Sequence, residues 1–219
     1  MAFFSRLRFS YLFRTVKNPG LLALLFVLLS GSSALATITL AAYLTSLPLL
    51  FPPLAPSAYI LFRAPMSLEA SPRNLICSHG AAVFIGLGAL HLFNFLFPES
   101  GLLDPEMMSA GRVGAIAVAM GGISAFMIGF KASHPPAAAT ALIAATGYFD
   151  DAAKIMGLIA AALLLAVEGA FFNRVLGGLP YPLWHGDPEA LQHYGPLAGI
   201  PQTGQSFWQR LTEDTFRRR

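Results

Sequence analysis

Charged residues are scarce in this 219-residue chain: Asp, Glu, Lys and Arg together make up 11% of it, against about a quarter of an ordinary soluble domain. Apolar residues make up 55%, and the mean hydropathy is +0.61. So few charges exclude a soluble globular protein, a disordered chain and an ordinary nucleic-acid binder. The apolar runs are continuous rather than alternating, which argues against a transmembrane barrel. A helical, multi-pass membrane protein in contact with the lipid bilayer remains.

Cysteine is almost absent, and the sequence motifs of common enzymes are missing. Cys77 is the single cysteine, so the chain has no disulfide framework and no thiolate metal site. The five histidines lack the spacing of metal ligands. No His-Glu-x-x-His, Gly-x-Ser-x-Gly or nucleotide-binding glycine loop is present. We therefore expect no enzyme, no cofactor and no metal; a membrane enzyme would depend on His79 and His134 alone.

Four apolar runs are long enough to cross a bilayer as helices. An α-helix rises about 1.5 Å per residue and the hydrocarbon core is about 30 Å thick, so a crossing takes about 20 residues. We therefore predict an all-α membrane protein. Its four full transmembrane helices are Leu21–Leu44, Asn74–Phe97, Gly111–Phe130 and Ala152–Phe172.

The segments outside these runs differ from them in composition. The N-terminal segment has four basic residues and no acid, which suits either an amphipathic helix at the membrane surface or a basic cytoplasmic tail. The C-terminal tail is polar, and its Tyr181 and Trp184 are expected at the membrane interface. The predicted divisions are the basic segment 1–20, the membrane repeats 21–97 and 98–176, and the cytoplasmic tail 177–219.

Two shorter apolar segments contain paired prolines. Phe51–Phe62 follows the first full span, and His134–Ala145 follows the third. Proline lacks an amide hydrogen and has a fixed φ, so a proline pair suits a helix start and interrupts a longer helix. The helix after each pair has about ten residues, or roughly 15 Å, which is half a membrane. The pattern predicts two proline-initiated half-helix segments.

These two segments match each other at an offset of 83 (135 − 52), which indicates an internal repeat. Both prolines, two alanines and one isoleucine are identical, and Ser57 is matched by the hydroxyl residue Thr140. Each segment lies between two full spans, so span, half-helix and span occur twice. Three crossings in each half make this an inverted 3+3 repeat, a plan used by transporters that bind substrate at broken helices.

Basic residues indicate six crossings with both termini in the cytoplasm. This topology places 12 of the 14 Lys and Arg residues on the cytoplasmic side and only Arg112 and Lys154 outside. Re-entrant half-helices would instead place Arg63 and Arg73 outside, against the positive-inside rule. We therefore expect a multi-pass protein of a bacterial plasma (inner) membrane.

Two half-helices that start near the midplane from opposite sides predict an anion site. The first amides of a helix lack partners within it, and its start carries a partial positive charge. Free N–H groups are expected at Leu54, Ala55 and Ser57 and at residues 137–139, and such a site binds a small inorganic anion without a buried cation. The predicted substrate-binding residues are Pro53, Leu54, Ala55, Ser57, His79, His134, Pro136, Ala137, Ala138 and Thr140.

Four ionisable residues have both a functional and a structural interpretation. His134 contacts the anion or carries a coupling proton, or else it caps the second half-helix. His79 lies within a span, which makes it a functional candidate, and otherwise it is a structural histidine. Lys131 steers anions at the inner mouth or extends to the interface. Glu168 carries a coupling proton or stabilises a helix contact.

Several motifs occur in one order along the chain: Phe51-Pro-Pro-Leu-Ala-Pro-Ser-Ala, Ser71-Pro-Arg-Asn, Ser78-His-Gly, Ser133-His-Pro-Pro-Ala-Ala-Ala-Thr-Ala-Leu, Phe172-Asn-Arg and Tyr181-Pro-Leu-Trp. Together they resemble the HPP family of integral membrane proteins, named for His134-Pro135-Pro136, over roughly residues 20–185. The resemblance implies four membrane helices. Members from cyanobacteria and chloroplasts are linked to nitrite transport, so it implies nitrite or a similar monovalent anion. Lys131 and Glu168 depart from the family's pattern, which bears on substrate and coupling more than on fold.

The predicted function is therefore transport of a small inorganic anion through a transporter or channel. The alternative is a non-transporting membrane sensor or scaffold that acts through its C-terminal tail. Six crossings are few to enclose a pathway, so a homo-oligomer is expected. No nucleic-acid partner is expected.

Overall fold

The computed structural model describes residues 8–15, 19–104 and 108–185, and these residues contain helices and loops but no strand. The predicted all-α fold is confirmed. The principal helices are α2 (Phe9–Thr15), α3 (Pro19–Thr45), α4 (Leu54–Arg63), α5 (Pro72–Leu96), α6 (Ala110–Gly129), α7 (Pro136–Ala145) and α8 (Ala152–Ala170). Three short turns are η1 (Leu68–Ala70), η2 (Pro98–Ser100) and the π-helical η3 (Phe171–Leu176), which continues α8.

Four of these helices, α3, α5, α6 and α8, are long and apolar enough to cross a membrane. Their bounds agree with the four predicted spans to within two residues. The most apolar window of α3 is only 17% buried in the protein. Its outward leucines, among them Leu24, Leu28 and Leu29, are more than half exposed. Side chains of this kind suit contact with lipid.

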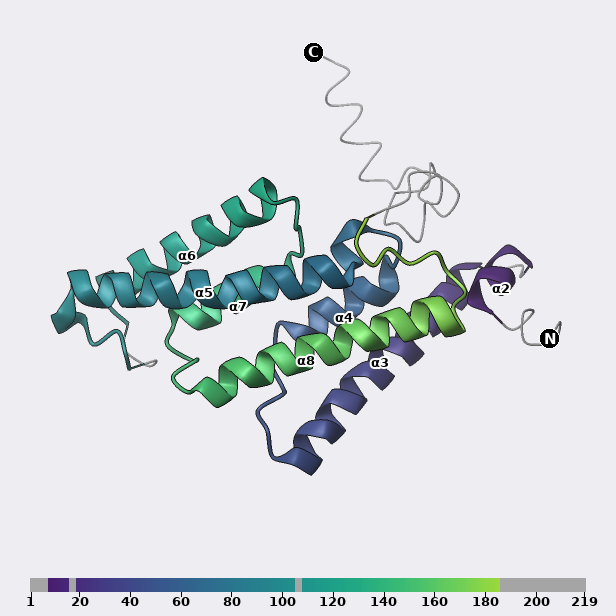
Figure 1. Cartoon of the computed structure of the whole chain (residues 1–219), viewed down its shortest axis with the longest axis horizontal. Coiled ribbons are helices and arrows are strands. Elements are labelled where there is room, and N and C mark those ends of the chain that lie inside the picture. The colour runs from purple at the N-terminus through teal and green to yellow at the C-terminus, as the bar shows by residue number, and fades with distance from the viewer. Residues whose placement is uncertain (1–7, 16–18, 105–107, 186–219) are drawn as a thin grey trace, which may run out of the picture.

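The two half-helices, α4 and α7, have the predicted length and start. Each has ten residues, and each begins at its proline pair, with Pro53 at the N-cap of α4 and Pro136 as the first residue of α7. In Figure 1 the helices from α3 to α8 alternate in direction, so α4 and α7 run opposite ways. The relation of the two halves by an inverted repeat stays a prediction.

The long helix α5 packs against α6, α7 and α8 (Figure 1). It packs tightly on α7 at Gly86. A Cβ atom at this position would lie 2.4 Å from the Cβ of Ala144 and 2.5 Å from the carbonyl oxygen of Ala141. Glycine is therefore needed here for the two backbones to pack this closely.

On the other side of the molecule, α4 is held between α3 and the end of α8. The ring of Phe62 packs edge-on against Phe26 of α3 and Phe172 of η3, with centroids 6.4 Å and 5.7 Å away. The side-chain amide of Asn173 donates a hydrogen bond of 3.1 Å to the carbonyl oxygen of Leu61. This bond satisfies one of the carbonyls that the last turn of a helix leaves without an internal partner.

The chain after α8 folds back over the corner between α4 and α5. Tyr181 has no exposed surface, and its hydroxyl donates to the carbonyl oxygen of Ala70 in η1. The Arg174 guanidinium donates to the Tyr181 carbonyl at 3.0 Å and 2.8 Å. Tyr181 therefore contacts the protein rather than lipid, and its position relative to the membrane interface stays a prediction. Trp184 is 60% exposed.

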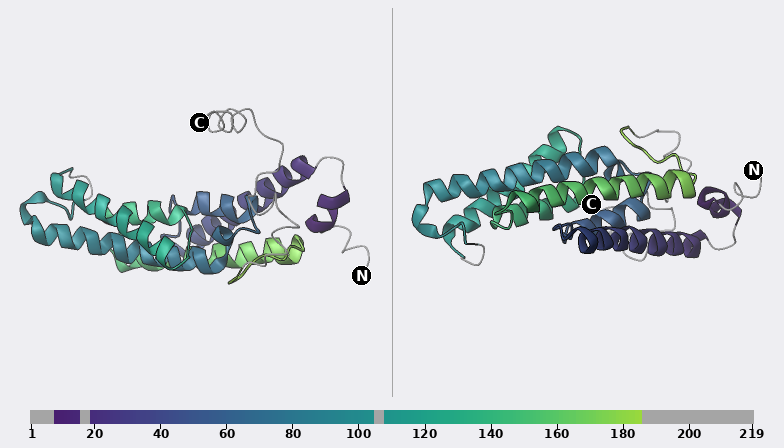
Figure 2. Two further views of the ribbon diagram at one scale, coloured as in Figure 1. Left: turned by 90° about the horizontal axis from the view of Figure 1, so that it is seen from above. Right: turned by 60° about the horizontal axis from the view of Figure 1, so that its bottom comes forward.

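The basic N-terminal segment is described only at residues 8–15 and 19–20. Its helix α2 lies beside the start of α3 in both views of Figure 2. Phe9 is buried, and its ring stacks on Phe26 with a centroid separation of 4.4 Å. Part of this segment thus packs on the protein itself. Most of the predicted C-terminal tail, residues 186–219, lies outside the described residues.

Candidate functional site

The starts of α4 and α7 come together on one histidine of α5. Nε2 of His79 lies 3.1 Å from the Ser57 hydroxyl oxygen of α4, and its Nδ1 lies 2.8 Å from the Thr140 hydroxyl oxygen of α7. All three side chains are at most 2% exposed. The matched hydroxyl residues of the two half-helices therefore share a single partner inside the protein.

His134 completes this group from the loop before α7. Its Nε2 lies 2.9 Å from the Ser57 hydroxyl oxygen, and its Nδ1 lies 2.7 Å from the carbonyl oxygen of Glu69. The His134 ring is fully buried and packs edge-on against the His79 ring, with centroids 5.2 Å apart. We call Ser57, His79, His134 and Thr140 the histidine–hydroxyl cluster.

The first turns of α5 hold the loop that carries His134. The side-chain amide of Asn74 donates to the Ser133 carbonyl at 3.2 Å, and the Ser78 hydroxyl donates to the Ala132 carbonyl. Sequence reasoning missed these two positioning contacts. Their signal was a set of polar side chains at the start of a span, where each needs a partner.

Arg73 adds two further bonds to the same loop. Its guanidinium donates to the carbonyls of Lys131 and Phe130 at 3.2 Å and 3.3 Å. It also lies 5.8 Å from the centroid of the Trp184 ring. The end of α6 carries a partial negative charge that a cation favours, so Arg73 fixes the point at which the chain leaves α6 toward His134.

The prediction of free backbone amides at the half-helix starts is wrong for five of these amides, which donate hydrogen bonds within the protein. Leu54, Ala55 and Ser57 donate to the carbonyls of Phe51, Pro52 and Pro53 at 3.0 Å, 3.3 Å and 3.3 Å. Ala137 and Ala138 likewise donate to His134 and Pro135, at 2.9 Å and 3.0 Å. The prolines bring their own carbonyls into tight turns, and these turns use the amides that an isolated helix start would leave unpaired.

The other predicted binding residues differ in burial. Pro53, Leu54, Pro136 and Ala137 are buried beside it in sequence, whereas Ala55 is exposed and Ala138 is half-buried. The structure thus brings together the side chains of Ser57, His79, His134 and Thr140. Of the remaining residues, Pro53 accepts a hydrogen bond of 2.8 Å from the Ser57 hydroxyl through its carbonyl oxygen.

Lys131 and Glu168 are not hydrogen-bonding partners of the cluster among the described residues. The Lys131 side chain is exposed. Glu168 lies on α8 near Thr37 of α3 and is 9% exposed. The Thr37 hydroxyl donates to the Ser33 carbonyl at 3.0 Å, and Oε2 of Glu168 has no hydrogen-bonding partner among the described residues. Glu168 thus lies at the contact between α8 and α3, and both its structural and its functional interpretation stay predictions.

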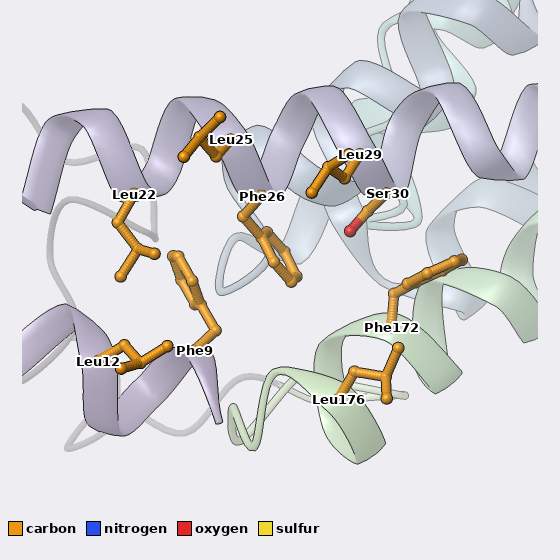
Figure 3. A pocket seen from close by; sticks show the side chains of 9 residues that line it. All are labelled: Phe9, Leu12, Leu22, Leu25, Phe26, Leu29, Ser30, Phe172 and Leu176. Carbon is orange, nitrogen blue, oxygen red and sulfur yellow. The ribbon is translucent and has the colours of Figure 1, made fainter. Parts of the chain in front are cut away.

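Two cavities among the described residues are lined mainly by apolar side chains, and no side chain of the cluster lines either of them. One, of about 330 Å³, lies between α3 and the start of α4 and includes Phe51, Pro52 and Leu54. The other, of about 360 Å³, lies between α2, α3 and η3. Figure 3 shows Phe9 and Phe26 pointing into the second cavity from its facing helices. Apolar walls suit a lipid chain better than an anion.

A model of one protein family matches most of the chain. It is described as "HPP, transmembrane region", and it matches residues 16–182. These residues contain all four cluster side chains and the residues that hold them. No curated protein and no solved structure matches the chain.

Proposed function

The chain belongs to the HPP family of transmembrane proteins, and we propose that it carries a small inorganic anion, such as nitrite, across the membrane. The observation that supports this most is the meeting of two half-helix starts at His79. Each start places a partial positive charge at its first turn. Two such ends around one buried point favour a negative charge there.

The cluster also offers the right donors. The Ser57 and Thr140 hydroxyls and the imidazole N–H groups are hydrogen-bond donors, which the closed cluster directs at its own members and at the Glu69 carbonyl, and no carboxylate belongs to the cluster. A small anion is bound by several such donors in place of its water. Because the four side chains are fully or almost fully buried, the described conformation is closed, and the anion exchanges with water when α4 and α7 separate.

We propose the following membrane topology as part of this function. The chain crosses a bacterial inner membrane six times, as an inverted pair of repeats with both termini in the cytoplasm. In this topology the cluster lies within the bilayer, and one half-helix reaches it from each side. A homo-oligomer belongs to the same proposal. The exposed apolar side chains of the single chain, such as those on α3, suit contact with lipid and with a neighbouring subunit.

Nitrite flux into liposomes that contain the purified protein tests this function. The wild-type protein is expected to raise nitrite uptake well above that of protein-free liposomes, which give the leak of nitrous acid through lipid. The double variant Ser57→Ala/Thr140→Val should lower this flux by about tenfold or more, since each loss removes a donor.

The matched control is Ser124→Ala/Thr45→Val. Both of these hydroxyls make the ordinary bond to a carbonyl one turn earlier, on exposed parts of α6 and α3. The control pair should keep the wild-type flux. Wild-type flux equal to that of protein-free liposomes, for nitrite, nitrate and chloride alike, would refute the proposed function.

A further inference from the structure

The histidine–hydroxyl cluster contains two imidazoles that share one hydroxyl group. Ser57 Oγ lies 2.9 Å from His134 Nε2, 3.1 Å from His79 Nε2 and 2.8 Å from the carbonyl oxygen of Pro53. A carbonyl only accepts hydrogen bonds, and a hydroxyl donates one and accepts two. These limits fix where the hydrogens can lie.

The contact with Glu69 determines where the His134 ring carries its hydrogen. The Glu69 carbonyl, 2.7 Å from Nδ1 of His134, can only accept, so Nδ1 of His134 carries a hydrogen. In the neutral ring, Nε2 then accepts the hydrogen of Ser57. Ser57 in turn accepts the Nε2–H of His79, and Nδ1 of His79 accepts the hydrogen of Thr140. Every donor in this arrangement points in one direction along the cluster.

A second arrangement of hydrogens fits the same heavy atoms. If a proton from water adds to Nε2 of His134, that ring donates from both nitrogens, to Glu69 and to Ser57. The Ser57 hydroxyl then turns its hydrogen to the Pro53 carbonyl and accepts from both histidines. One N–H bond forms as one O–H bond of a hydronium ion breaks, a water molecule is left behind, and the cluster gains one positive charge. The cluster can therefore take up a proton without moving a side chain.

A second added proton is disfavoured by geometry. The two rings are 5.2 Å apart and buried, and two positive charges at that separation repel strongly where water is excluded. The starts of α4 and α7 add their own partial positive charges. The cluster therefore holds one extra proton at most.

No charged side chain forms a hydrogen bond with either histidine ring among the described residues. From η1, the Glu69 carboxylate accepts from the Ser133 hydroxyl at 3.3 Å. From α5, Arg73 donates to the carbonyls at the end of α6. Helices α4 and α7 contribute only Ser57 and Thr140 to the cluster. On α6 and α8, Arg112 donates to the Leu102 carbonyl, Lys154 pairs with Asp150, and Glu168 faces Thr37.

We propose that a monovalent anion and one proton, held on the His79–His134 pair, occupy the cluster together, so that the anion crosses the membrane with a proton. This inference rests on the proposed function and adds its coupling ion. A buried positive charge between two helix starts is unfavourable alone, and an anion neutralises it. Each ligand then strengthens the binding of the other by the same factor.

Nitrite binding to the purified protein in detergent, followed by titration calorimetry, tests the coupling. At each pH the titration is repeated in two buffers with different heats of ionisation, which gives the number of protons taken up per anion. We expect an uptake that approaches one proton as the pH rises above the pKa of the free cluster. Over the same range the nitrite Kd should increase about tenfold for each pH unit.

Two variants and one control connect this uptake to the pair. His134→Gln should abolish the proton uptake and the pH dependence of the Kd. Ser57→Ala, which removes the shared hydroxyl, should reduce the uptake at a given pH at least twofold and serves as the second variant if His134→Gln does not fold. His91→Gln replaces an exposed histidine of the same helix and should match the wild type.

The outcomes separate the two proposals. Nitrite flux in liposomes together with binding that takes up no proton between pH 5 and 8 would overturn the coupling and leave the transport function standing. Proton uptake that persists unchanged in His134→Gln would also overturn it, because the proton would then lie elsewhere. Absence of flux and of binding would refute the proposed function itself.

Discussion

Nε2 of His134 lies 2.9 Å from the Ser57 hydroxyl oxygen, although the two residues are 77 positions apart in the chain. This contact joins the two halves of the membrane region directly. It also connects the loop before α7 to the first turn of α4, so a movement of either half-helix changes the surroundings of both histidines. The hydrogen bonds of the cluster therefore depend on the relative position of the two half-helices.

Thr140→Val should weaken anion binding. Valine has nearly the same shape as threonine but lacks the hydroxyl that lies 2.8 Å from Nδ1 of His79. The loss of one buried hydrogen bond costs about 1–1.5 kcal/mol, so the nitrite Kd should rise roughly tenfold in a binding titration. Thr45→Val at the exposed end of α3 is the matched control. Equal effects of the two changes would argue against the site.

Gly86→Ala should destabilise the protein. The added methyl group would lie 2.4 Å from the Cβ of Ala144, so α5 and α7 must move apart, at a cost of about 1–3 kcal/mol. Thermal unfolding in detergent measures the change. Gly88→Ala lies on the same helix with nothing within 4 Å of the new methyl group, and it should be neutral or stabilising because alanine favours a helix. An equal loss in both variants would contradict the close packing described at Gly86.

Tyr181→Phe should reduce stability near neutral pH and reduce its loss in alkali. The change leaves the buried carbonyl of Ala70 without its partner, which costs about 1–3 kcal/mol. Burial also raises the pKa of the Tyr181 phenol. The folded protein thus holds this proton more tightly than the unfolded chain. The contribution of Tyr181 is complete below the unfolded pKa of about 10 and is lost as the pH rises above it.

Unfolding temperatures at pH 7 and pH 11 measure both effects for Tyr181. The difference between the two temperatures should be smaller in Tyr181→Phe than in the wild type. Tyr43→Phe, which changes a tyrosine that is 81% exposed, is the control for the general effect of alkali. The same alkaline loss in wild type and Tyr181→Phe would show that the phenol is accessible to water.

Glu168→Gln should leave nitrite affinity within about twofold of the wild type, because its side chain faces Thr37 of α3 and contributes no bond to the cluster. The same calorimetric titration tests this expectation. His79→Gln, in which one ring that bridges both half-helices is lost, provides the contrast and should weaken binding by tenfold or more. A large loss in Glu168→Gln would give that carboxyl a part in anion binding.

Local sequence features were sufficient to predict the elements of the fold. The lengths of the apolar runs gave the four long helices, and the proline pairs gave the starts of α4 and α7. Both signals depend on residues close together in the chain. Backbone rules for proline and the thickness of the bilayer act on such short stretches, so neighbours far along the chain do not alter them.

The arrangement of the cluster required the tertiary structure. The sequence suggested His79 and His134 as separate candidates, but the face that α5 turns toward α4 and α7 depends on packing at positions such as Gly86. The hydrogen bonds of the first amides were mispredicted for a related reason. The carbonyls of Pro52 and Pro53 fold back onto Ala55 and Ser57, and this turn geometry follows from the conformation of the loop before α4.

The bond from Asn173 to the Leu61 carbonyl has a consequence for biosynthesis. The chain is made from its N-terminus, and 112 residues separate the two partners. When α4 first leaves the ribosome, its last turn has no such donor, and its ten residues are too few to span the bilayer. The last turn of α4 therefore obtains this donor only after η3 has been synthesised, and chains that end before Asn173 lack the bond.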